Sequence, residues 1–303
     1  MTVINMLSFG ETGVAVADEQ ASLAVRKFNF AKKLHELDET TIFAGAGSLY
    51  YMMNVYDRVK DSMKGLGDDY LLSHLHGSVV DSIIDYNKQL RETALQSSFG
   101  IGMDDFSTGT HLETGRPLED QMKSMMGNRL SKIEESNHGN AILLGGIENG
   151  KFEIYIADYS GNASKVYIPH QSIGSGAEES ERILFNYSTL LSREGREKID
   201  PKEGLVKVIE ATNSSARMNQ GVGGTISIAY VTSEGIKNPT ENDCRLASEI
   251  VEAHSLDLLG KNPTYNFIDR IILNGNSENV KGEFKSEIKD WDSFNEHLRG
   301  YKH

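Results

Sequence analysis

Residues 1–22 of the chain read MTVINMLSFGETGVAVADEQAS. The apolar residues within 2–8 predict a short strand, and the two glycines that follow supply the flexibility of a turn. The run VAVAD at residues 14–18 is typical of a second, buried strand. We therefore expect a hairpin that brings Asp18, at the end of the second strand, back beside Thr2, at the start of the first.

Length and charge limit the kinds of partner. The chain has 303 residues, enough for one large domain or two ordinary ones. Hydrophobic residues make up 38% and charged residues 25% of the sequence, which is the balance of a soluble globular protein. The net charge of −13 argues against nucleic acid, which needs a basic face, and against an anionic membrane surface. We expect neither as a partner.

Nothing in the sequence indicates export or a membrane anchor. No apolar run approaches the roughly 20 residues of a membrane-spanning helix. No basic segment followed by an apolar segment marks a secretory signal. Cys244 is the single cysteine, which excludes an intrachain disulfide and fits a reducing cytosol. The expected location is the cytoplasm.

Two motifs that suggest a cofactor or a metal have simpler explanations. Residues 145–151, GGIENGK, have the spacing of a phosphate-binding loop, but Phe152 stands where Ser or Thr must hold magnesium. Strand-like runs flank these residues, which is typical of a tight hairpin. His74 and His76 lie two residues apart in a helical pattern and therefore do not share a face. We expect no cofactor and no metal.

The rest of the chain alternates blocks of strands with blocks of helices. The periodicity of its apolar residues predicts the following elements: a strand at 39–47, helices at 48–63, 69–96 and about 118–137, a loop at 97–116, four strand-like runs between 141 and 176, helices at 178–191 and 201–218, a hairpin at 224–235, and finally a helix from 241, a strand at 267–273 and a polar tail. Segregated strands and helices predict an α+β fold in which helices pack outside sheets.

The threonine of the first strand has a chemistry of its own when its amine is free. The hydroxyl of an N-terminal threonine is a nucleophile, and its α-amine can take the proton directly or through one water. The pKa of such an amine, about 7.7–8.0, suits a base at neutral pH, and a neighbouring cation favours the neutral form. The sequence offers Thr2, Asp18 to hold a cation, and a choice of lysines.

These residues resemble the β-type subunits of the proteasome and their bacterial relative HslV, which are N-terminal-nucleophile hydrolases. The spacing from Thr2 to Asp18 equals the family's spacing from nucleophile to aspartate. Three further stretches carry the resemblance, in the family's order: KKLHELDETTIFAGAGSLYYMMNVYDRV at 32–59, the middle strands with the turn IGSG at 173–176, and the closing hairpin GGTISIAYVTSEGI at 223–236.

The resemblance implies a catalytic group. Thr2 is the nucleophile and Asp18 holds the lysine that tunes its amine. Counting back from Gly45 places Lys33 on the family's lysine, while counting from Thr2 leaves Lys32 open. The N–H of Gly47 would receive the oxyanion.

Other implied roles concern the amine and the substrate. Ser175 matches the serine that supports the terminal amine. Asn219 and Val222 match an aspartate and a serine of the family, so this chain lacks a charge and a hydroxyl there. Gly45 and Leu49 would line the substrate pocket.

The implied fold is a four-layer αββα sandwich, with two facing antiparallel sheets between helices. Residues 2–236 would form this domain, with 66–116 as an atypical helical insertion and 237–303 as a C-terminal extension. The implied function is a threonine peptidase that acts on peptides or unfolded polypeptides within a homo-oligomer, such as a ring. An ATP-dependent unfoldase as a partner stays open.

Two alternatives stand beside the peptidase. The substitutions at Asn219 and Val222 favour a catalytically inactive scaffold or assembly subunit of the same fold. The insertion at 66–116 allows a transpeptidase or amidase with a different pocket. The peptidase requires removal of Met1, which is expected before a residue as small as threonine.

Overall fold

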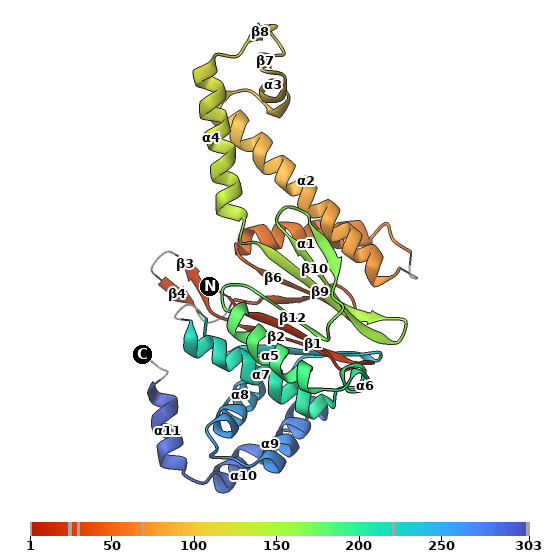
Figure 1. The fold of residues 1–303 in the computed structure, drawn as a ribbon, viewed down its shortest axis with the longest axis vertical. Helices are drawn as coiled ribbons and strands as arrows, with labels where there is room; N and C mark the ends of the chain where they lie inside the picture. Colours follow the sequence, from red (N-terminus) through yellow and green to blue (C-terminus); the bar gives the residue numbers. More distant parts are fainter. Residues whose placement is uncertain (1, 24–25, 29–30, 68–69, 220–221, 301–303) are drawn as a thin grey trace. The chain divides into compact units, whose positions relative to one another are not determined.

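The hairpin expected within residues 1–22 is present and forms the centre of a sheet. Strand β1 (Ile4–Ser8) pairs antiparallel with β2 (Gly13–Asp18), with Ile4 opposite Ala17. The computed structural model describes residues 2–23, 26–28, 31–67, 70–219 and 222–300, so Met1 lies outside the described residues. The sheet has the order β12-β1-β2-β13-β14 (Figure 1), with β12 at His170–Ile173, β13 at Ile226–Thr232 and β14 at Gly235–Lys237.

A second five-stranded sheet has the order β11-β10-β9-β6-β5. Its strands are β5 (Leu34–Glu36), β6 (Thr41–Ala46), β9 (Ala141–Glu148), β10 (Lys151–Asp158) and β11 (Ala163–Lys165). Two glycines let the sheets approach closely. A Cβ at Gly13 of β2 would lie 2.2 Å from the Phe152 ring of β10, and one at Gly145 of β9 would lie 2.7 Å from Met6 Sδ of β1.

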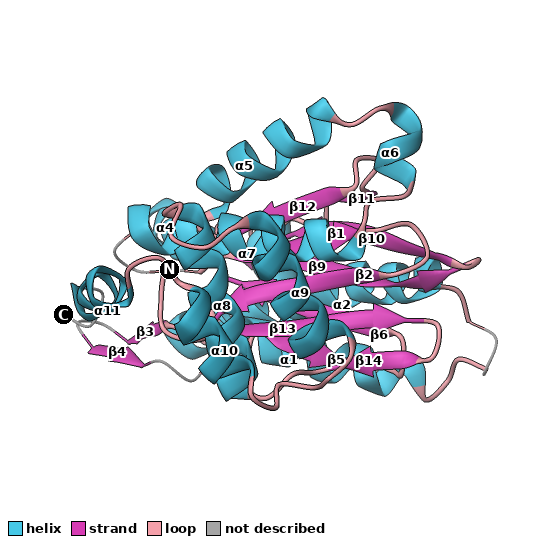
Figure 2. Ribbon diagram, turned by 90° about the horizontal axis from the view of Figure 1, so that it is seen from below, coloured by secondary structure: helices cyan, strands magenta, loops and turns pink. Residues whose placement is uncertain are grey.

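Helices cover the other face of the first sheet. The hydrophobic core there contains Leu7, Val14 and Val16 together with apolar residues of the helices. The helices are α5 (Ala177–Leu190), α6 (Arg193–Glu197), α7 (Pro201–Met218) and α8 (Glu241–Ser255). Figure 2 shows α7 and α8 lying over β1, β2 and β13. Strand β2 is therefore buried on both faces, which explains its unbroken apolar sequence.

After β14, the described part of the C-terminal extension consists of helices and the loops that join them, and the strand expected at 267–273 was wrong. Those residues complete α9 (Lys261–Ile268) and form a π-helical turn (Asp269–Leu273). The β-branched run suggested a strand, but the buried residues Ile268, Ile271 and Ile272 have the i, i+3, i+4 spacing of a helix. The polar tail forms α10 (Val280–Glu287) and α11 (Trp291–Gly300), whose residues Phe284 and Phe294 join the same core.

The contacts divide the chain into two units. The first contains both five-stranded sheets except for end residues of β9, β10 and β11, together with α5 to α11 and the whole extension. The second comprises Gly47–Ala141 and Ala157–Ala163 and contains α1 (Leu49–Met63), α2 (Leu72–Phe99), α3 (Met103–Thr108) and α4 (Asp120–Asn137). The loop expected at 97–116 was partly wrong, because α3 and two short paired strands, β7 (Thr110–His111) and β8 (Arg116–Pro117), occupy much of it.

A buried polar contact joins the helices of the second unit. Tyr51 of α1 donates its hydroxyl hydrogen to Asn87 Oδ1 of α2 over 2.9 Å, and Asn87 Nδ2 donates to the carbonyl of Tyr159. Because all three groups are buried, these hydrogen bonds fix the register of α1 against α2.

A further short strand pair, β3 (Ala21–Leu23) and β4 (Arg26–Phe28), belongs to the first unit.

The sheet-to-sheet contact can be tested at Gly13. The variant Gly13→Ala places a methyl group against the Phe152 ring, and we expect it to destabilise the protein by about 1–3 kcal/mol through overpacking. The matched control is Gly282→Ala in α10, where no atom lies within 4 Å and alanine is the better helix former. Urea unfolding measures the stability of both variants against the wild type. A Gly13→Ala midpoint equal to wild type would contradict the close sheet packing.

Candidate active site

The carboxylate of Asp18 joins three segments of the first unit. Asp18 is the last residue of β2 and is 1% exposed. Its Oδ1 accepts hydrogen bonds from Lys33 Nζ at 2.7 Å and from the backbone N–H of Val3 at 2.8 Å. Its Oδ2 accepts from the backbone N–H of Gly223 at 3.3 Å. The residue after Thr2, the lysine segment and the turn before β13 therefore meet on one side chain.

The geometry selects Lys33 over Lys32 as the lysine that pairs with Asp18. Lys33 is 7% exposed, and its Nζ donates to the carbonyl of Gln20 at 2.7 Å as well as to Asp18. Lys32 is exposed. Val3 N and Lys33 Nζ contact the same oxygen of Asp18. The ammonium group of Lys33 therefore lies beside the backbone of the residue that follows Thr2.

Burial changes the proton affinity of both partners. It raises the pKa of the Asp18 carboxyl, and the charge of Lys33 with the N–H groups of Val3 and Gly223 opposes this. Burial lowers the pKa of the Lys33 amine, and the carboxylates of Asp18 and Glu19 oppose this. The two pKa values therefore approach one another, so that Lys33 gives up a proton more readily than an exposed lysine does.

Thr2 is held by the turn between β12 and α5. Its backbone nitrogen donates to Ser175 Oγ at 3.1 Å, and its carbonyl accepts from the N–H of Gly176 at 3.1 Å. Gly174 has φ +96°, and a Cβ there would lie 2.3 Å from the Thr2 carbonyl oxygen. Thr2 itself is 8% exposed. Glycine at position 174 is thus required both by a left-handed backbone and by the close approach of Thr2.

The side chains of Asn219 and Val222 carry neither a charge nor a hydroxyl. Asn219 follows the last residue of α7, and its Nδ2 donates to the carbonyl of Ser215 at 3.0 Å, back along its own helix. Val222 is 4% exposed and packs close to Gly176. Among the residues of this region that the structure describes, Ser175 supplies the side chain that contacts the nitrogen of Thr2.

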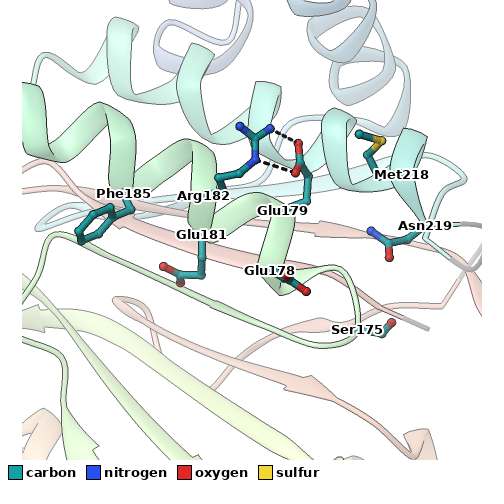
Figure 3. Close-up of a pocket in the computed structure, with 8 residues that line it drawn as sticks. All are labelled: Ser175, Glu178, Glu179, Glu181, Arg182, Phe185, Met218 and Asn219. Atoms are coloured by element: carbon teal, nitrogen blue, oxygen red, sulfur yellow. Dashed lines mark hydrogen bonds and ion pairs between the residues drawn. The ribbon is translucent and has the colours of Figure 1, made fainter.

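A pocket of about 540 Å³ opens beside Ser175. Ser175 and Asn219 lie at one end of it, and residues of α5 together with Met218 of α7 line the rest, as Figure 3 shows. Glu179 is bound by Arg182, at 2.7 and 3.0 Å, and by the hydroxyl of Ser214. The other lining side chains are Glu178, Glu181, Phe185 and Met218.

The remaining predicted site residues lie on β6 and in the second unit. Gly45 is on β6 and is half-buried. Gly47 has φ +117°, and a Cβ there would lie 2.1 Å from Asn140 Oδ1, which also accepts from the N–H of Ser48. Leu49 is the first residue of α1 and is 52% exposed. The roles of these three residues stay predictions.

Sequence reasoning missed several groups around Thr2 and Asp18. The carbonyl of Gln20 and the N–H of Gly223 are backbone groups, which carry no residue signature. The sequence indicates a turn at Gly174, but the contact of Gly174 with Thr2 joins residues far apart in the chain. Within the described ranges, no three His, Cys, Asp or Glu side chains lie close enough together to hold a metal ion.

In comparisons with known proteins, no family model and no curated protein matches this chain. Of the helices that the structure describes, none has both the length and the apolar character needed to cross a membrane.

The buried ion pair predicts strong coupling between its partners. Lys33→Met leaves the Asp18 carboxylate with backbone donors alone, and Asp18→Asn leaves Lys33 without a counter-charge. We expect each to cost about 3–5 kcal/mol of unfolding free energy, and Asp18→Asn/Lys33→Met to cost clearly less than the sum. Urea unfolding of all four forms measures the coupling.

The exposed pair between Lys64 and Asp61 is the matched control. Lys64→Met should leave the unfolding midpoint unchanged, because solvent screens that pair. The ion pair has no structural role if Lys33→Met behaves like Lys64→Met.

Proposed function

We propose that this protein is a threonine-type peptidase of the N-terminal-nucleophile class. The observation that carries the proposal is the convergence on Thr2. Its nitrogen contacts Ser175, and the next residue shares one oxygen of Asp18 with Lys33. A hydroxyl nucleophile, its own amine, a buried cation and an anchoring carboxylate are the groups that this chemistry needs.

The proposed reaction uses the amine of Thr2 as the base. Thr2 Oγ attacks the carbonyl carbon of an amide while its proton passes to the α-amine, directly or through water. The C–N bond then breaks, the ammonium returns the proton to the leaving amine, and water hydrolyses the ester. Lys33 favours the neutral amine by its charge, and Asp18 keeps Lys33 in place. The N–H of Gly47 is proposed as the oxyanion donor.

The wider architecture and setting belong to the same proposal. We propose the four-layer αββα sandwich over residues 2–236, with 237–303 as a helical extension. Gly45 and Leu49 would line the pocket for the substrate side chain. Peptides or unfolded polypeptides are the proposed substrates, and a cytoplasmic homo-oligomer, such as a ring, is the proposed assembly. An ATP-dependent unfoldase would be needed for folded substrates.

A specific observation favours a second candidate, a catalytically inactive subunit of the same fold. Asn219 bonds to its own helix, and Val222 is buried without a polar atom. These positions therefore leave the amine of Thr2 with less polar support than the family pattern gives. The two candidates differ in whether the bond between Met1 and Thr2 is cleaved and whether Thr2 then reacts.

Intact mass and labelling of Thr2 separate the candidates. We expect the purified protein to begin at Thr2 and to react covalently with an electrophilic peptide probe. Thr2→Ala should abolish labelling and peptide hydrolysis, because no other group combines the hydroxyl with the terminal amine. Thr189→Ala, which changes an exposed threonine of α5, should retain both activities. Hydrolysis that persists in Thr2→Ala, or a residue still attached before Thr2, would argue for the inactive subunit or another mechanism.

A further inference from the structure

Buried hydroxyl groups lie between α7 and the turn that holds Thr2. Ser180 of α5 and Thr212 and Ser215 of α7 are each 0% exposed. A buried hydroxyl costs free energy unless it has a hydrogen-bond partner. The partners of these three side chains therefore show which parts of the first unit they connect.

Ser215 forms a hydrogen bond outside its own helix. Its Oγ donates to the carbonyl of Gly176 at 2.8 Å, and the two residues are 39 positions apart in the chain. A carbonyl oxygen has no hydrogen, so the serine is the donor in this contact. A helical hydroxyl commonly bonds to the carbonyl four residues back, as Thr212 does to Val208 at 2.8 Å. Ser215 instead joins α7 to the turn before α5.

Gly176 connects this hydroxyl with Thr2. The N–H of Ser180 lies 3.5 Å from the Gly176 carbonyl, so Ser215 at 2.8 Å is the closer donor to it. The N–H of Gly176 donates to the carbonyl of Thr2 at 3.1 Å. The two backbone groups of one residue therefore link Ser215 to Thr2.

The surroundings of Gly176 are tightly packed. A Cβ at this position would lie 3.0 Å from Val222 Cγ2, 3.1 Å from Val3 Cβ and 3.3 Å from Ser215 Cβ. These atoms belong to the turn before β13, to the residue after Thr2 and to α7. A displacement of Gly176 therefore changes its contacts with the backbone next to Thr2.

Helix α7 is fixed against β1 and α5 by further buried contacts. Asn5 of β1 donates from Nδ2 to Thr212 Oγ1 at 2.9 Å, and both residues are buried. The Oγ atoms of Ser180 and Ser215 lie 2.8 Å apart, which joins α5 to α7. Buried polar contacts favour one placement of a helix, because another placement leaves a group unpaired. Helix α7 can therefore act as a fixed support for the turn.

We propose that Ser215 is a positioning residue for the reactivity of Thr2. It holds Gly176, whose N–H binds the carbonyl of Thr2. It thereby also restrains the adjacent Ser175, whose hydroxyl contacts the nitrogen of Thr2. The effect on reactivity rests on the proposed function, whereas the restraint of the turn by Ser215 does not.

Hydrogen–deuterium exchange of the full chain tests the restraint without any activity. The N–H groups of Gly176 and Ala177 are hydrogen-bonded within the turn and to Thr2. Ser215→Ala removes the hydroxyl that holds the Gly176 carbonyl. We expect these two amides to exchange about tenfold faster in this variant, because the turn opens more often.

Ser188→Ala is the matched control for exchange. Ser188 is 5% exposed, and its hydroxyl donates to the carbonyl of Phe185 on its own helix, α5. Its removal should leave the exchange of Gly176 and Ala177 at the wild-type rate. Equal exchange of these amides in Ser188→Ala and Ser215→Ala overturns the restraint.

Labelling of Thr2 by an electrophilic peptide probe tests the positioning role. We expect Ser215→Ala to lower the labelling rate at saturating probe about tenfold, while the probe concentration that gives half of this rate stays at its wild-type value. Ser215→Cys keeps a weaker donor and should give an intermediate rate. The cysteine variant also carries both experiments if Ser215→Ala does not fold.

The two experiments separate the inference from the proposed function. If wild-type Thr2 is never labelled while exchange is faster in Ser215→Ala, the proposed function fails and the restraint of the turn stands. If wild-type Thr2 is labelled and Ser215→Ala reacts at the same rate, the positioning role is refuted.

Discussion

The carboxylate of Asp18 is the group on which the arrangement around Thr2 depends. It is buried, and a buried carboxylate is stable only when hydrogen-bond donors surround it. Here the donors come from Lys33, from the backbone next to Thr2 and from the turn that precedes β13. Satisfying one charge thus brings three segments of the chain together at one end of the first sheet.

The packing of the sheets supplies the rigid frame for that contact. Strand β2 alternates small residues, Gly13, Ala15 and Ala17, with Val14 and Val16. The valines lie in the core beneath the helices, and Gly13 admits the Phe152 ring from the second sheet. A shift of one residue in the register of β2 would move every side chain to the opposite face of the sheet. Because both faces are buried and packed differently, such a shift is unfavourable, and the position of Asp18 is fixed.

One buried ion pair lies beside Thr2 in the proposed mechanism. The pair of Lys33 with Asp18 acts on the amine through its charge. Glu181 of α5 connects this helix to β12 near the turn of Ser175, since its carboxylate accepts a hydrogen bond from the N–H of Ser172. The pair of Lys33 with Asp18 is buried, so that water screens its charges little.

The sequence by itself determined the opening hairpin and the proximity of Thr2 and Asp18, because turn residues and strand periodicity are local properties. It also indicated a structured turn at Gly174–Gly176, although not the carbonyl of Thr2 that fills the space beside Gly174. The choice of Lys33 over Lys32 and the helical state of residues 267–273 were decided by the tertiary structure. Each depends on which side chain a neighbouring element buries, and burial is a property of the folded chain that local sequence does not specify.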